Sequence, residues 1–223
     1  MEIKRYSITD KNLYRNVRKT VDTEIKYYHI EDDFLDFSFL EELNSVLNTY
    51  DSKLIDSKLS DSNLFKNGIN NENLDWFSIN SSKDLVFKSY DDLIIQKCLE
   101  VNSAIFNYNL DSLIDTRYLV YNVGKYSTWH VDEPIGVKTN NVEALNAAKW
   151  RKLSVSIALN DDYDGGEFGI LIPTDPRKCL HNIKLKKGAA IFYPSHMAHQ
   201  ISTVTNGYRK SLVYWFCGPR HAN

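Results

Sequence analysis

The chain has 223 residues, of which 43% are hydrophobic and 25% are charged. This length and apolar content suffice for one compact domain with a buried core. Lysine and arginine number 27 and aspartate and glutamate 29, a formal charge of −2, so no strong overall field draws the chain to nucleic acid or to an anionic membrane. We therefore expect no membrane partner, and the composition gives no support to a nucleic-acid partner.

The cysteines and the first residues indicate the compartment. Cys98, Cys179 and Cys217 are odd in number, far apart and not in C-x-x-C spacing, so the sequence predicts neither a disulfide framework nor a zinc site. No apolar leader follows Met1, and no stretch approaches the roughly 18 apolar residues of a membrane span. We expect a cytoplasmic protein.

Residues 1–112 are expected to give helical support to the rest of the same domain. Apolar residues recur at helical spacing in three segments: 9–26, 34–47 and 90–108. A short strand is predicted at 27–30. Aspartate, serine, asparagine and lysine dominate residues 51–73, which is typical of a solvated excursion between core elements.

The pattern becomes alternating after residue 112. Short apolar runs occupy 115–123, 128–131, 152–159, 167–172, 181–186, 189–193, 199–205 and 208–217. Turn residues such as Asn206-Gly207 separate these runs, and such an even series of short strands is typical of a sandwich or jelly-roll barrel. The sequence therefore predicts a mainly β core over 113–223, and an α+β fold with the helices included.

A histidine and an aspartate stand two residues apart in the stretch WHVD that begins at position 129. Alternate side chains of a strand point to the same face, so His130 and Asp132 project side by side. A neutral imidazole and a carboxylate are two of the three ligands of the facial triad that holds non-haem Fe(II). The third would be a distant histidine. His196 follows a predicted turn and His199 opens a predicted strand, and spacing alone does not choose between them.

Two longer stretches carry a more specific pattern, RYLVYNVGKYSTWHVD from Arg117 and AAIFYPSHMAHQISTVTNGYRKSLVYWF from Ala189. The spaced motifs are Tyr121, Gly124, His130 and Asp132; then Asp164-Gly165-Gly166-Glu167; then Tyr193-Pro194-Ser195; then His199-Gln200; and finally Arg209. In this order, the region 115–217 resembles the prolyl/lysyl-hydroxylase-like (prolyl 4-hydroxylase-related) branch of the Fe(II)- and 2-oxoglutarate-dependent oxygenases. One position departs from the pattern, because Ser127 stands where the family usually has a second tyrosine.

The resemblance implies a double-stranded β-helix core and a set of site residues. The metal ligands that it implies are His130, Asp132 and His199. Its co-substrates are 2-oxoglutarate and O2, with ascorbate as an optional reductant. Arg209 would bind the far carboxylate of 2-oxoglutarate, and Ser211, two residues on, could donate to the same carboxylate. Tyr121 is either another donor to it or a core residue of its strand.

Arg209 and Lys210 are both candidates for that far carboxylate. A guanidinium suits it because its planar fork makes two parallel hydrogen bonds. A simple hairpin at Asn206-Gly207 would instead place Lys210 on the face of His199. The family's last two strands lie in opposing sheets, so the resemblance selects Arg209.

The activity implied by the resemblance is hydroxylation of an unactivated C–H bond, in a prolyl or lysyl residue of a peptide or protein. Asp132 favours hydroxylation because related halogenases have a small residue there. Alternative substrates are a free amino acid, another small metabolite or a nucleobase, and a further alternative is a ligand-binding barrel without catalysis. The insertion 136–149 is expected to act as a lid over the site. Trp215 either lines the substrate pocket or packs in the core.

Overall fold

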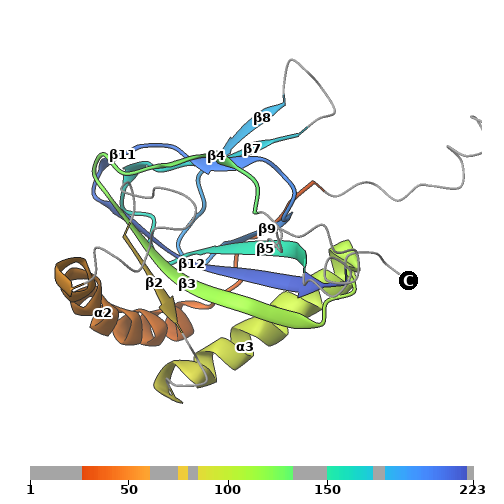
Figure 1. The fold of residues 1–223 in the computed structure, drawn as a ribbon, viewed down its shortest axis with the longest axis horizontal. Helices are drawn as coiled ribbons and strands as arrows, with labels where there is room; N and C mark the ends of the chain where they lie inside the picture. Colours follow the sequence, from red (N-terminus) through yellow and green to blue (C-terminus); the bar gives the residue numbers. More distant parts are fainter. Residues whose placement is uncertain (1–26, 61–74, 80–84, 133–149, 173–178, 220–223) are drawn as a thin grey trace, which may run out of the picture.

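Two facing β-sheets and a helical layer make up the described part of the chain (Figure 1). The structure is a computed structural model that describes residues 27–60, 75–79, 85–132, 150–172 and 179–219. Its elements are β1 (His29–Glu31), α2 (Phe37–Ser60), β2 (Asp75–Ile79), α3 (Leu85–Val101), the π-helical turn η1 (Asn102–Phe106), β3 (Ser112–Asn122), β4 (Ser127–His130), β5 (Trp150–Ala158), β6 (Asp164–Gly165), β7 (Phe168–Leu171), β8 (Leu180–Ile183), β9 (Ala190–Pro194), β10 (His199–Ile201), β11 (Val204–Asn206) and β12 (Tyr208–Gly218).

The large sheet has the order β1-β9-β5-β12-β3-β2, and the smaller sheet has the order β4-β10-β7-β8. A third pair, β11-β6, connects them at one end. The neighbouring strands pair antiparallel, as in β12 with β3 and with β5. Two facing antiparallel sheets of short strands confirm the mainly β core that the alternating pattern predicted.

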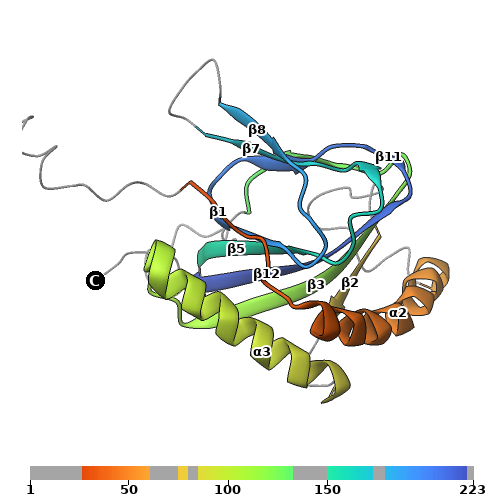
Figure 2. The same cartoon turned by 180° about the vertical axis from the view of Figure 1, so that it is seen from behind.

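The two helices cover the outer face of the large sheet, and the smaller sheet faces its inner side (Figure 2). Strand β12 shows the division, because Leu212, Tyr214 and Phe216 belong to the buried cluster under the helices. The odd-numbered side chains of β12, such as Arg209 and Ser211, point the opposite way, to the space between the sheets. No helix in the described ranges is both long enough and apolar enough to cross a membrane.

Helix α2 is held to the sheet by a regular apolar stripe, Leu40, Leu43 and Leu47, all of which are buried. We expect Leu43→Ala to lower the free energy of unfolding by about 2–5 kcal/mol, because it leaves a cavity in a packed core. Denaturant unfolding of the two proteins measures this, with the exposed Ser45→Ala as the control. A loss no larger than that of Ser45→Ala would show that α2 does not depend on this stripe.

The N-terminal half differs from its prediction in three respects. Helix α2 continues to Ser60, so the predicted excursion was wrong over 51–60. Polar composition alone does not end a helix, and no glycine or proline interrupts residues 37–60. Strand β2 was not predicted, and the strongest predicted helix begins earlier, at Leu85. The predicted helix over 9–26 and the insertion over 136–149 lie outside the described residues.

The predicted strand over 199–205 is divided between two sheets. Its first part, β10, pairs with β4 and β7, whereas its second part, β11, pairs with β6. A Cβ at Gly165 would clash with the carbonyl oxygen of Thr203, just before β11, so only glycine fits there. Because β11 does not pair with β12, hairpin parity between His199 and Lys210 does not apply.

Candidate metal centre

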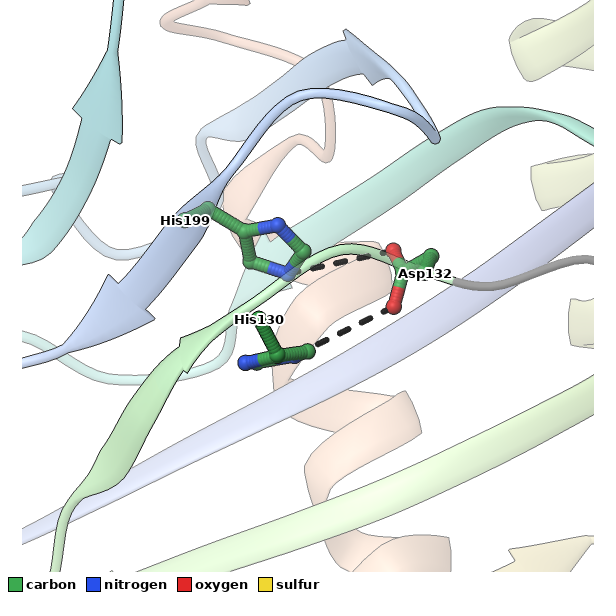
Figure 3. A group of neighbouring side chains, drawn as sticks. All are labelled: His130, Asp132 and His199. Carbon is green, nitrogen blue, oxygen red and sulfur yellow. Dashed lines mark ion pairs between the residues drawn. The ribbon is translucent and has the colours of Figure 1, made fainter.

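Strands β4 and β10 bring two distant histidines together at the inner side of the smaller sheet. His130 and His199 are directly opposite each other in the register, and their ring centroids are 4.3 Å apart. Asp132 lies just beyond the end of β4, where its backbone N–H donates to the carbonyl of Ser195 at 2.9 Å. Figure 3 shows the three side chains converging from the two chain segments.

The ligand atoms of these three residues lie within 4.8 Å of one another. His130 Nε2 is 4.0 Å from Asp132 Oδ1, and His199 Nε2 is 3.8 Å from Asp132 Oδ2. Two imidazole nitrogens and one carboxylate oxygen form the donor set that suits non-haem iron and leaves one face of the metal open. His196 is exposed and does not belong to this group.

Backbone carbonyls fix the tautomer of both histidines. His130 Nδ1 lies 2.7 Å from the carbonyl of Thr128, and His199 Nδ1 lies 3.0 Å from the carbonyl of Met197. A carbonyl only accepts, so each Nδ1 donates and each Nε2 keeps its lone pair for a metal. Burial lowers the pKa of His199 against the opposing influence of Asp132, which favours the neutral imidazole that a metal requires.

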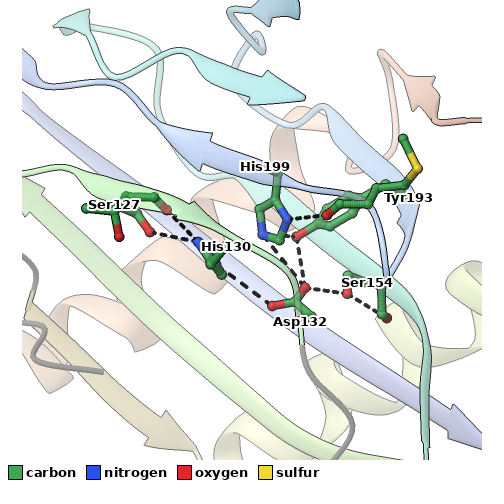
Figure 4. A network of polar contacts seen from close by, with 9 residues as sticks. Ser127, His130, Asp132, Ser154, Tyr193 and His199 are labelled. Atoms are coloured by element: carbon green, nitrogen blue, oxygen red, sulfur yellow. Dashed lines mark hydrogen bonds and ion pairs between the residues drawn. The ribbon is translucent and has the colours of Figure 1, made fainter. Parts of the chain in front are cut away.

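A buried polar network surrounds Asp132 (Figure 4), and the sequence did not predict the roles of Ser154, Tyr193 and Ser195 in it. Ser154 Oγ donates to Asp132 Oδ2 at 2.5 Å and lies 2.8 Å from the hydroxyl of Ser195. Tyr193 donates to the same Oδ2 at 3.3 Å, and its oxygen lies 3.2 Å from His199 Nε2. Burial raises the pKa of Tyr193 well above its ordinary value, and the Asp132 carboxylate adds to this, so the phenol keeps its proton.

Arg209 is a buried cation on the inner face of β12, with 2% of its surface exposed. Its guanidinium donates to Ser211 Oγ at 2.9 Å and lies 5.4 Å from the ring of Tyr121. Within the described ranges, no aspartate or glutamate forms an ion pair with it. A buried charge without a counter-charge is costly, so this position is suited to an anionic ligand.

Tyr121 lies beside Arg209, and its pKa is influenced by burial and by both Arg209 and Asp132. Burial raises the pKa of Tyr121 to about 12, while Arg209 lowers it and Asp132 raises it further. Because this pKa lies far above 7, the phenol is protonated at neutral pH. It can donate a hydrogen bond to an anion held at Arg209.

Lys210 points the other way, toward the helical layer. Its ammonium donates to Asn48 at 3.0 Å and lies 5.8 Å from the ring of Tyr118, which belongs to the core under the helices. The structure therefore places Arg209, and not Lys210, on the inner face with Ser211.

Trp215 is buried near the metal centre, with 7% of its surface exposed. It pairs across the sheet with Ser154, the residue that donates to Asp132. The guanidinium groups of Arg117 and Arg151 lie 4.9 and 4.5 Å from its ring. Trp215 is thus stacked with two cations beside the site, a placement that the sequence left open between pocket and core.

Comparisons with known proteins point to one family. The 2OG-Fe(II) oxygenase superfamily matches residues 116–217. A PKHD-type hydroxylase of Psychrobacter sp. (strain PRwf-1) is 28% identical over 190 residues, which cover 84% of this chain and 68% of that protein. The chain spans about half the length of several further PKHD-type hydroxylases, with 52% of the Caulobacter sp. (strain K31) and Janthinobacterium sp. (strain Marseille) proteins covered.

Solved structures share the fold. A Pseudomonas putida prolyl-4-hydroxylase has a TM-score of 0.63 at 16% identity and covers 90% of this chain and 96% of its own. A prolyl hydroxylase of Trichoplax adhaerens, solved with a peptide fragment of the hypoxia inducible factor oxygen degradation domain, has a TM-score of 0.62 at 18% identity, with 92% of each chain covered. The region that matches the 2OG-Fe(II) oxygenase superfamily, whose metal is Fe(II) and whose co-substrate is 2-oxoglutarate, contains all three clustered residues and the buried arginine.

Proposed function

We propose that this protein hydroxylates a C–H bond of a prolyl residue, or of a lysyl residue, in a peptide or protein. In this proposal, His130, Asp132 and His199 hold Fe(II), and Arg209 binds the far carboxylate of 2-oxoglutarate. The observation that carries it is the buried Arg209 guanidinium without an acidic partner in the described ranges, next to a cluster of two histidines and one aspartate. A dicarboxylate that chelates the metal at one end supplies the missing counter-charge at the other.

When bound, Fe(II) and 2-oxoglutarate supply the oxidation: O2, 2-oxoglutarate and a substrate C–H bond become succinate, CO2 and a substrate C–OH group. The residues of the chain provide position. Arg209, oriented by Ser211, fixes the far carboxylate, and Tyr121 donates to it as a neutral phenol. His130 and His199 each donate from Nδ1 to a backbone carbonyl, so their Nε2 atoms carry no proton and need not lose one to bind a metal.

The exposure of the three side chains indicates the direction of substrate approach. Side chains of Asp132 and His199 are 5% exposed, whereas that of His130 is 30% exposed. The centre is thus closed on the side of the large sheet and reachable from the side of His130. A residue of a peptide can approach there while the buried side excludes water from the co-substrate.

The choice of a prolyl or lysyl residue rests on likeness to relatives. The curated relatives are PKHD-type hydroxylases, and the two structural neighbours are prolyl hydroxylases, one of them solved with a peptide fragment. A shared fold does not fix a substrate, so a direct assay is required.

The test is incubation of the purified protein with Fe(II), 2-oxoglutarate, O2 and a panel of proline- and lysine-containing peptides, with free proline and free lysine alongside. We expect succinate to form in step with a gain of one oxygen atom on a prolyl or lysyl peptide, as measured by mass spectrometry. His199→Ala serves as the inactive control. A gain of oxygen on the free amino acids alone would overturn the proposal of a peptide substrate. If neither the peptides nor the free amino acids increase succinate formation, prolyl and lysyl substrates are both wrong.

Tyr121→Phe tests the co-substrate end of this proposal. It removes one hydrogen bond to a charged group, which contributes roughly 1.5–3 kcal/mol, so the affinity for 2-oxoglutarate should fall by about 10-fold or more. Titration of the metal-loaded protein with 2-oxoglutarate measures the change. Tyr126→Phe, in the same segment and half-buried, is the matched control and should leave the affinity unchanged. Equal affinities for the two variants would exclude Tyr121 from the co-substrate site.

A further inference from the structure

The hydrogen bonds around Asp132 are distributed unequally between its two carboxylate oxygens. Both Ser154 and Tyr193 donate to Oδ2, at 2.5 and 3.3 Å. Within the described residues, Oδ1 receives no hydrogen bond, and it faces His130 Nε2 at 4.0 Å. The two oxygens therefore differ in what they can still bind. Oδ1 is available to a metal, whereas the lone pairs of Oδ2 are already engaged.

Ser195 fixes the direction of the serine hydrogen bonds. A hydroxyl has one hydrogen, and Ser154 uses it on Asp132, so the 2.8 Å contact between the serines is a donation from Ser195 to Ser154. The carbonyl of Ser195 also accepts the backbone N–H of Asp132 at 2.9 Å. One residue thus holds both the backbone of Asp132 and the serine that engages its Oδ2.

Tyr193 acts on two of the three clustered residues at once. Its oxygen lies 3.3 Å from Asp132 Oδ2 and 3.2 Å from His199 Nε2. Because the Nδ1 of His199 carries the ring proton, its Nε2 is an acceptor and competes with Oδ2 for the phenol hydrogen. Once the Nε2 lone pair is committed to a metal, the phenol can donate only to Oδ2. Metal binding therefore strengthens the hold on that oxygen.

We propose that Ser154 and Tyr193 are positioning residues that keep Oδ2 of Asp132 off the metal, so that Asp132 binds through Oδ1 alone. This inference rests on the proposed function, because a carboxylate bound through both oxygens would occupy a coordination position that 2-oxoglutarate or O2 needs. The same strand offers a matched control. Ser156 is buried two residues along on the same face as Ser154, and no hydrogen bond from it to Asp132 exists.

The test uses the variants Ser154→Ala, Tyr193→Phe and Ser156→Ala and measures Co(II) affinity by competition with a chelator. We expect Ser154→Ala and Tyr193→Phe to weaken Co(II) binding by roughly 10–100-fold, because Asp132 loses the groups that hold Oδ1 toward the metal, and this loss outweighs what an added contact from the unoriented Oδ2 returns. Ser156→Ala should stay within about threefold of the unaltered protein. Ser154→Thr keeps the hydroxyl and should restore most of the affinity.

A second readout separates positioning from a general packing effect. In protein saturated with Co(II), Ser154→Ala should lower the affinity for 2-oxoglutarate, because the freed Oδ2 competes for its position, while Ser156→Ala should not. If Ser154→Ala does not fold, Tyr193→Phe, which keeps the ring beside Phe168, makes the same test. If the folded test variants bind Co(II) as tightly as Ser156→Ala does, and also bind 2-oxoglutarate as tightly as it does, the inference is overturned. If the unaltered protein binds Co(II) but not 2-oxoglutarate, the proposed function fails, and the Co(II) affinities still decide the role of Ser154 and Tyr193.

Discussion

Asp132→Ala is expected to lower the affinity for Fe(II), or for its surrogates Mn(II) and Co(II), by more than about 100-fold. Loss of a partner of a metal ligand already costs 10–100-fold, and this change removes a ligand outright. Asp132 is the single anion of the group and accepts hydrogen bonds from Ser154 and Tyr193. Calorimetric titration with Mn(II) measures the affinity, and the thermal unfolding midpoint shows whether the variant is folded.

The two histidines near the end of the chain supply the control for this result. His199→Ala should weaken metal binding as strongly as Asp132→Ala, because His199 is buried against the aspartate. His196→Ala should bind normally, because His196 is exposed and lies outside the cluster. Retention of the metal by a folded His199→Ala protein, with loss in His196→Ala, would reverse the assignment of the third ligand.

Arg209→Ala is expected to lower the affinity for 2-oxoglutarate by about 30-fold or more. Removing one partner of a buried, hydrogen-bonded charge pair costs roughly 2–5 kcal/mol. Lys210→Ala, one residue away, should change the affinity by less than a few-fold, because its ammonium lies on the helical side and bonds to Asn48. Anaerobic titration of the Fe(II) protein with 2-oxoglutarate, followed by its charge-transfer absorbance, gives both affinities.

The comparison of these two variants decides which face of β12 binds the co-substrate. If Lys210→Ala proved to be the impaired protein and Arg209→Ala bound normally, the inner face of β12 would not carry the co-substrate. Ser211, which accepts from Arg209, would then lose its proposed role as well.

The parts of the site that sequence could predict lie in one short segment, at the end of β4 and just beyond it. His130 and Asp132 are two residues apart, and strand periodicity alone places them on one face. The choice of Arg209 over Lys210 needed the family resemblance. The division of residues 199–206 between two sheets depends on the pairing of β10 with β4 and β7 and of β11 with β6, which local pattern does not encode.

The network around Asp132 could not be predicted for a different reason. Ser154 and Tyr193 are 22 and 61 residues from Asp132, and neither spacing carries a periodic signal. A weak signal did exist, since Ser154 and Ser156 place two hydroxyls inside the run 153–158, whose other residues are apolar and buried. Tyr193 belongs to the motif Tyr193-Pro194-Ser195, but it meets Ser154 through the pairing of β9 with β5, which the motif does not encode.

The most direct test of the account is a crystal structure of the protein with Mn(II) and 2-oxoglutarate, grown without oxygen and recorded with anomalous scattering of manganese. We expect one anomalous peak within bonding distance of His130 Nε2, Asp132 Oδ1 and His199 Nε2, with the far carboxylate of 2-oxoglutarate on Arg209 and Tyr121. A manganese ion held by other residues, or a far carboxylate on Lys210, would contradict it.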